Sequence, residues 1–237
     1  MSHTINEYGQ PVGQPLPGWQ PRPLPQRETL EGRYCRLEPL SLAQHSDDLF
    51  AAWALAQDGR DWTYLFAGPF NDRAEWLSYM QQMENSRDPL HFAVVDRESG
   101  RAVGTLALMR IVPEHGVIEV GHVAFSPLLK QTRQATEAHY LLMRYAFEQL
   151  GYRRYEWKCD SLNAPSRRAA ARLGFQYEGE FRQAIVYRGR TRDTSWFSII
   201  DGEWPQVKRG FERWLAVENF DAGQKQRERL ETLRQTL

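Results

Sequence analysis

The order in which extended and helical segments alternate after Gly32 constrains the fold of this chain more than any other feature. Three extended runs, over residues 91–96, 102–112 and 116–125, are separated only by turn residues, which is typical of an antiparallel meander. Helices and strands then alternate. Joining such an order into one sheet requires parallel as well as antiparallel pairing. The sequence therefore predicts an α/β fold with a mixed, twisted central β-sheet flanked by helices.

The two ends of the chain differ in composition from the part between them. Six prolines between Pro11 and Pro25 favour extended backbone, and Trp19 among them suggests an arm that lies on the domain surface. A loose leader is the alternative for this segment. We divide the chain into a proline-rich arm over 1–30, a central domain over 31–205, and a C-terminal helix with a charged tail over 206–237. The other expected strands cover 33–37, 154–159, 175–187 and 191–200, and the expected helices cover 41–57, 71–85, 135–150, 163–173, 203–220 and 224–237.

Composition excludes several classes of function. Of 237 residues, 30 are basic and 30 acidic, so no net charge attracts the chain to nucleic acid or to anionic lipid. A run of about 18 apolar residues, which a membrane span needs, is missing, and residues 1–20 do not resemble a secretory signal. Cys35 and Cys159 are far apart and lack the spacing of metal ligands. We therefore expect a cytoplasmic protein with reduced thiols and no metal site.

Two helix starts combine small residues with polar groups. The first follows the run that ends at Phe125 and includes residues 130–137, where free backbone N–H groups and the helix dipole suit a pyrophosphate. The second begins at Asn163, a natural N-cap, with Pro165 in the first turn. Structural capping is the alternative to a catalytic role for this second start.

These residues carry a family resemblance. The order of elements, the helix start Ala135-Thr136-Glu137-Ala138, and the pattern Asn163-Ala164-Pro165-Ser166 followed by Leu173-Gly174-Phe175 resemble the GNAT superfamily of acetyl-CoA-dependent N-acetyltransferases. Residues 154–175 and the ending 183–201 are most similar to the ribosomal-protein N-terminal acetyltransferases. The resemblance covers about residues 30–205 and implies the GNAT, or acyl-CoA N-acyltransferase, fold.

The resemblance implies acetyl-CoA as the acyl donor, held by one strand end, one loop and one helix start. In the superfamily the loop reads Arg/Gln-x-x-Gly-x-Gly/Ala, whereas this chain has Arg133 at the first glycine. Arg133 either reshapes the loop or pairs with a phosphate. The non-catalytic alternative is an acyl-CoA-binding module. The implied donor-binding residues are His122, Val123, Ala124, Phe125, Lys130, Gln131, Thr132, Arg133, Gln134, Ala135, Thr136 and Asn163.

Two side chains are candidates for proton transfer. The tyrosine that many superfamily members use as an acid would fall at Ala170, so the resemblance points to Ser166 as the donor to the departing thiolate. A hydroxyl bonded to the backbone is its alternative. Glu119 is the candidate base, directly or through a water, and a solvent-facing strand residue is the alternative. Strict alternation would put His122 on the opposite face from Glu119 unless a bulge intervenes, and Asp193 is expected to stabilise a turn.

An aromatic group between the first two helices is interpreted as a substrate lid, with core packing as the alternative. No strong acidic patch accompanies it, so an amine acceptor such as a peptide N-terminus fits better than a polycation. Acetylation of a small-molecule amine is the alternative activity. Analogy alone favours a homodimer. The aromatic residues are Trp53, Trp62, Tyr64, Phe66 and Phe70.

Overall fold

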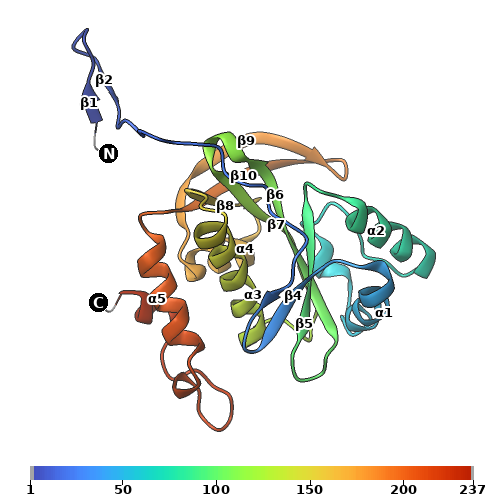
Figure 1. Ribbon diagram of the computed structural model, residues 1–237. Coiled ribbons are helices and arrows are strands. Elements are labelled where there is room, and N and C mark those ends of the chain that lie inside the picture. The colour runs from blue at the N-terminus through green and yellow to red at the C-terminus, as the bar shows by residue number, and fades with distance from the viewer. Residues whose placement is uncertain (1–2, 236–237) are drawn as a thin grey trace.

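The centre of the molecule is one eight-stranded sheet with a single parallel pair among its described strands. A computed structural model describes residues 3–235, and in it the strands lie in the order β3-β4-β5-β6-β7-β8-β10-β9 (Figure 1). Strands β7 and β8 are parallel, whereas every other neighbouring pair is antiparallel. The α/β class, the meander and the mixed sheet expected from the sequence are thus confirmed.

Most expected elements are present, with bounds shifted by a few residues. Strand β3 and the N-terminal pair β1 and β2 were not predicted, because each has only two or three residues and carries little periodicity. The strands are β1 His3–Ile5, β2 Pro11–Gly13, β3 Leu30–Glu31, β4 Cys35–Pro39, β5 Leu90–Asp96, β6 Ala102–Val112, β7 Val117–Phe125, β8 Arg154–Asp160, β9 Gln176–Tyr187 and β10 Arg190–Ile200, and the helices are α1 Leu42–Trp53, η1 Gly59–Trp62, α2 Arg73–Asn85, η2 Pro113–His115, α3 Arg133–Arg144, η3 Tyr145–Gln149, α4 Ala164–Leu173, α5 Trp204–Leu215, η4 Val217–Asn219 and α6 Leu230–Gln235.

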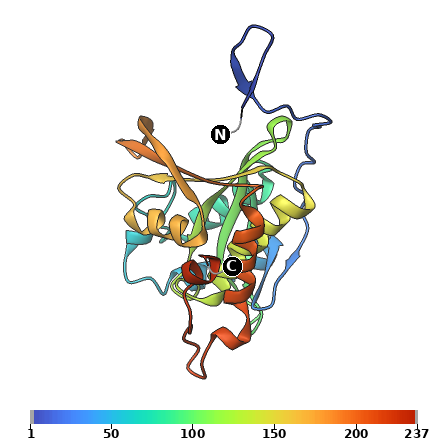
Figure 2. The same ribbon diagram turned by 90° about the vertical axis from the view of Figure 1, so that its left-hand side faces the viewer.

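The two faces of the sheet are covered differently. Alternate residues of β5 divide between two cores: Phe92 and Val94 face the core that α3, α4 and α5 complete, and Ala93 and Val95 face the smaller core under α1 and α2. Figures 1 and 2 show α1 and α2 beside the β4–β6 half of the sheet, and α3 and α5 on the opposite face. We call the sheet face on the side of α1 and α2 the lid face.

A buried carboxylate ties the first strands to α3. Glu137, which is 4% exposed, accepts backbone N–H bonds from Arg33, Tyr34 and Cys35 at 2.6–2.7 Å. A Cβ on Gly32 would lie 2.7 Å from the same carboxylate, so this turn requires glycine. The start of the sheet is therefore fixed to the helix that follows the loop expected to bind the donor.

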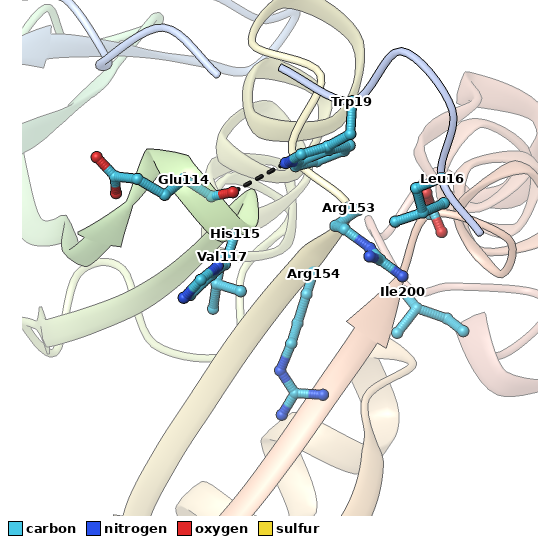
Figure 3. Close-up of a pocket in the computed structure, with 9 residues that line it drawn as sticks. Leu16, Trp19, Glu114, His115, Val117, Arg153, Arg154 and Ile200 are labelled. Carbon is cyan, nitrogen blue, oxygen red and sulfur yellow. Dashed lines mark hydrogen bonds between the residues drawn. The ribbon is translucent and has the colours of Figure 1, made fainter. Parts of the chain in front are cut away.

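The proline-rich arm begins as a hairpin that projects from the domain and then runs along its surface (Figures 1 and 2). Trp19 fixes the arm where it meets the β6–β7 turn: its Nε1 donates to the carbonyl oxygen of Glu114 at 2.8 Å (Figure 3). A cavity of about 560 Å³ lies beside this contact, at the N-terminal ends of β7 and β8. It is lined by Leu16, Trp19, Glu114, His115, Val117, Arg153, Arg154, Ile200 and Asp201.

The C-terminal prediction was too helical. Helix α5 ends at Leu215 rather than near residue 220, and only Leu230–Gln235 of the expected tail helix is helical. Leu230 and Leu233 are buried in the main core, and Arg234 Nη1 donates to the carbonyl oxygen of Arg172 at 2.8 Å. The tail therefore packs on its own domain, because its apolar residues match a short contact rather than a long helical stripe. Residues 236–237 of that expected helix lie outside the described residues.

Residues 3–235 contain neither a membrane-spanning helix nor a metal-binding cluster. None of the helices there has the length and apolar character needed to cross a membrane. The same part of the chain contains no group of three or more His, Cys, Asp or Glu side chains arranged to hold a metal ion.

Candidate active site

The parallel strands β7 and β8 separate halfway along their length. They pair from Val117 with Arg154 to Val120 with Trp157, and the pairing stops there. Strand β8 continues beside β10 as far as Asp160, while β7 continues beside β6 as far as Phe125. The carboxyl-terminal halves of the two strands thus border an opening in the sheet.

A bulge reshapes β7 along this opening. Gly121 pairs with Ala107 and Ala124 with Thr105, so His122 and Val123 together lie opposite one residue of β6. The φ of His122 is +48°, a left-handed conformation that a regular strand never uses. A bulge releases strand backbone groups from the ladder. The predicted donor-binding residues His122, Val123, Ala124 and Phe125 therefore all lie on the irregular edge of the opening.

The loop after β7 presents unpaired backbone donors at the start of α3. Within the described residues, the N–H groups of Gln131, Arg133 and Gln134 have no acceptor, while that of Ala135 is capped by the Thr132 hydroxyl at 3.2 Å. Gln131 adopts a φ of +61° without being glycine. Three amides at a helix N-terminus form an anion site. They fit the pyrophosphate of acetyl-CoA, so this part of the chain could hold the donor.

The charged side chains of the loop contact other residues of this chain. Lys130 forms an ion pair with Asp61 in η1. The Arg133 guanidinium lies between the rings of Tyr34 and Phe220, with centroid distances of 4.5 and 4.4 Å. The structure thus places Arg133 in an aromatic sandwich, an arrangement that neither of the two sequence interpretations anticipated.

The second helix start supplies a hydroxyl and an amide. Asn163 caps α4, since its side-chain oxygen accepts the Ser166 N–H at 3.1 Å. The Ser166 hydroxyl accepts the indole N–H of Trp157 at 3.0 Å, and it lies within hydrogen-bonding reach of the Cys159 thiol. Thr136 lies opposite, on α3, and accepts a hydrogen bond from Arg172 at 3.1 Å. The hydroxyl of Ser166 is therefore oriented by a side chain and makes no backbone hydrogen bond within the described residues.

Glu119 belongs to a row of alternating charges on the lid face. Its carboxylate, 4% exposed, binds Arg110 at 2.8 Å and Lys158 at 2.7 Å, so it is not the solvent-facing residue of the alternative interpretation. The row contains three cations and three anions from β6, β7, β8 and β9, and it crosses β10, which lies between β8 and β9. We call it the charge row, and its members in order are Arg110, Glu119, Lys158, Glu156, Arg154 and Glu178.

Two histidines lie beside Glu119. Because of the bulge, the ring of His122 packs against His91 with 5.0 Å between centroids, and His91 is in register with Ala107 and Gly121 on the lid face. Strict alternation, which would have put His122 on the other face, therefore fails here. Burial and the nearby Arg110 cation lower the pKa of His122. Burial lowers the pKa of His91 to about 3, so both rings are neutral at pH 7.

The aromatic segment between α1 and α2 divides between the two interpretations. Trp53, Trp62 and Phe70 pack on one another in the smaller core. Tyr64 and Phe66 instead reach the far half of the sheet: the Tyr64 hydroxyl donates to the carbonyl oxygen of Leu162 at 3.2 Å, and Phe66 packs on Tyr187 at 5.4 Å. One part of the segment therefore belongs to the smaller core, and the part around Tyr64 and Phe66 extends over the lid face.

Sequence reasoning missed most of the lid face. Only Glu119 was selected from the charge row, since its other members show no local motif and meet only through strand register. The carboxylate of Asp193, which was expected to stabilise a turn, instead accepts the N–H of Gln183 within β9 at 2.6 Å, at an irregular point of the β9–β10 pairing. Charged and aromatic residues alternate along β8. This alternation was the sequence signal that could have placed Lys158 and Glu156 on the same sheet face.

A separated parallel strand pair, with free amides on one side and a lid on the other, defines a two-substrate transferase. Residues 35–176 match the family model described as an acetyltransferase (GNAT) domain. The chain belongs to this family of N-acetyltransferases, which use acetyl-CoA as the co-substrate.

Solved structures and curated relatives agree with this assignment. A GCN5-related N-acetyltransferase from Brucella melitensis is 49% identical, with a TM-score of 0.92 over 93% of this chain and 100% of that one. An uncharacterized N-acetyltransferase, p20 of Bacillus licheniformis, is 27% identical over 75% of this chain and 98% of its own length. The uncharacterized N-acetyltransferase YnaD of Bacillus subtilis is 27% identical over 48% of this chain, and the match spans 65% of that relative.

Proposed function

We propose that this N-acetyltransferase acetylates the α-amine at the N-terminus of a peptide or protein. The supporting observation is the state of Glu119, whose carboxylate is already engaged by two cations. An α-amine, with a pKa of about 7.7–8.0, gives up its proton to a carboxylate more readily than a lysine amine with a pKa near 10.4. The charge row also contains as many cations as anions, so the lid face offers no acidic patch to a polycation.

In this proposal each element has one task. The amides of Gln131, Arg133 and Gln134 bind the pyrophosphate, and the bulged end of β7 positions the thioester carbonyl. Glu119 accepts the amine proton, directly or through a water, and Ser166 donates a proton to the departing thiolate. Acetyl-CoA supplies the activated acyl group.

The likeness to the ribosomal-protein branch stays within this proposal. A structure described as a putative ribosomal-protein-serine acetyltransferase from Vibrio cholerae is 20% identical to this chain, with a TM-score of 0.63. Identity at that level supports the shared fold alone.

Thiol release from acetyl-CoA tests the proposal. The acceptors are a peptide with a free N-terminus and no lysine, a peptide with a blocked N-terminus and one lysine, and a set of small amines. We expect the first peptide to give the highest kcat/KM. A preference for small amines would favour the alternative activity, and stabilisation by acetyl-CoA without thiol release for any acceptor would indicate a binding module.

Ser166→Ala tests the assigned acid in the same assay. We expect kcat to fall roughly tenfold to a hundredfold, with the thermal shift caused by acetyl-CoA unchanged. Ser166→Thr is the matched control, because it keeps a hydroxyl and should retain most of the activity. Equal kcat in the wild type and Ser166→Ala would remove Ser166 from the mechanism.

A further inference from the structure

Arg192 of β10 is a buried cation without a carboxylate partner. The residue is 7% exposed, and its Nε donates to the Thr194 hydroxyl at 3.1 Å. The guanidinium carbon lies 5.9 and 6.0 Å from the ring centres of Phe66 and Tyr187. In the described part of the chain, its two Nη groups have no hydrogen-bond acceptor and no ion pair.

Two other arginines of this sheet face behave differently. Arg110 and Arg154 both bind carboxylates of the charge row, and both are more exposed than Arg192. A guanidinium stays charged at every accessible pH, and burying an unpaired charge is costly. Arg192, the more buried cation, therefore lacks the partner that both less buried ones have.

The nearest acidic side chain in register is already engaged. Asp160 pairs through the backbone with Thr194, the residue that binds Arg192 Nε. Its carboxylate accepts the Tyr187 hydroxyl at 3.0 Å and the N–H of Leu162 at 2.9 Å, and it forms no ion pair with Arg192 within the described residues. The hydrogen-bond pattern thus leaves Arg192 to an anion from outside the chain.

The position of Arg192 relates that anion to the acceptor. Strand β10 lies next to β8, which borders the opening, and Phe66 of the lid covers Arg192. The free amides of residues 131, 133 and 134, in the donor-binding loop after β7, lie on the other side of the opening. We propose that Arg192 binds a carboxylate or phosphate group that the acceptor carries about 20 Å from its amine, because Arg192 lies two strand spacings from β7 and six residues along β10 from Ser198, the residue level with Glu119. This inference rests on the proposed function.

Kinetics with matched acceptors test the assignment. Each pair shares one N-terminal sequence and differs in one group: Asp against Asn, or phosphoserine against serine, at one position between the fourth and the seventh residue. For the wild type we expect a lower KM for the anionic member, and Arg192→Ala should raise that KM roughly tenfold or more. The KM for the neutral member and for acetyl-CoA should stay within about twofold. The pair with the larger difference distinguishes carboxylate from phosphate.

Arg190→Ala is the matched control, since Arg190 is exposed on the same strand and makes no ion pair within residues 3–235. We expect unchanged kinetics for both members of each pair. An equal effect of Arg192→Ala on anionic and neutral acceptors, or a raised KM for acetyl-CoA alone, would overturn the proposal.

A binding measurement separates this proposal from the proposed function. With saturating coenzyme A occupying the anion site at the start of α3, acetate and inorganic phosphate should raise the melting temperature of the wild type but not of Arg192→Met, which keeps an unbranched apolar stem. The variant alone should be at least as stable as the wild type without anion, because it removes an unpaired buried charge. Equal anion effects on both proteins would contradict an anion site at Arg192. Anion-dependent stabilisation without thiol release for any acceptor would contradict the proposed function alone.

Discussion

The two sides of the opening between β7 and β8 present different chemical groups: backbone amides on one side and charged side chains on the other. On the donor side, backbone amides of residues 131, 133 and 134 have no acceptor among residues 3–235, and the nearby cations Lys130 and Arg133 are engaged elsewhere. On the acceptor side, long side chains from four strands pair with one another in the charge row. One side holds free hydrogen-bond donors and the other holds satisfied charges.

This difference indicates how each substrate is selected. Backbone donors are fixed by the helix start and recognise any phosphate of the right geometry, so the donor side suits a co-substrate common to a whole family. Side chains that are already paired with one another disfavour a substrate that brings an unpaired charge. Selection of the acceptor then depends on the few side chains that have no partner. The acceptor side is therefore where members of the family are expected to diverge.

The largest expected effect is on the acceptor side, at Glu119. Glu119→Gln keeps the shape of the side chain but cannot take a proton, so kcat/KM should fall at least a hundredfold, about 2.7 kcal/mol. Stabilisation by acetyl-CoA should not change. Steady-state thiol release and thermal shift measure the two quantities.

Glu178→Gln is the control for this change, because Glu178 is also paired with a cation of the charge row but lies on β9. We expect it to retain activity within a few fold. If both variants lost activity equally, the integrity of the charge row, and not a base at Glu119, would be required.

The next effect is on the donor side and concerns one backbone N–H. Arg133→Pro removes that donor at the first position of α3, where proline is favoured, and Thr132 before it has the extended backbone that proline requires, with a φ of −102° and a ψ of 168°. The KM for acetyl-CoA should rise about tenfold, or 1.4 kcal/mol, with kcat unchanged.

Arg133→Ala keeps the N–H and separates the two roles of this residue. We expect little change in KM, because the guanidinium lies between Tyr34 and Phe220. A tenfold rise in both variants would show that the guanidinium itself binds the phosphates, and no rise in either would move the donor site elsewhere.

The smallest effect concerns the neutral ring of His91. Its pKa is lowered to about 3 by burial, so below about pH 6.5 the unfolded chain binds a proton that the folded chain refuses. Stability is present above that pH and is lost as the pH falls. Between pH 7 and pH 6 this histidine should cost about 0.7 kcal/mol.

Denaturant unfolding of the wild type and His91→Met at both pH values measures this cost. The variant should lose less stability than the wild type by that amount. The same pH dependence in both proteins would show that His91 accepts a proton in the folded state.

The sequence was a better guide to the donor side than to the acceptor side. The capping pattern of residues 130–136 is local, and the helix start lies within two residues of its expected position. On the acceptor side, Lys158 meets Glu119 across 39 residues of sequence, through a register that no local pattern specifies. The bulge at His122 also changes the face of a side chain, and non-glycine residues with positive φ give no sequence signal.

The contact of Glu137 with residues 33–35 bears on how the protein is made. The carboxylate and its three amide donors are separated by 102–104 positions, so these buried amides acquire their acceptor only after α3 has been synthesised. Closing a loop of this length costs much chain entropy. During translation these three amides therefore remain without their acceptor until the ribosome has delivered residue 137 of α3.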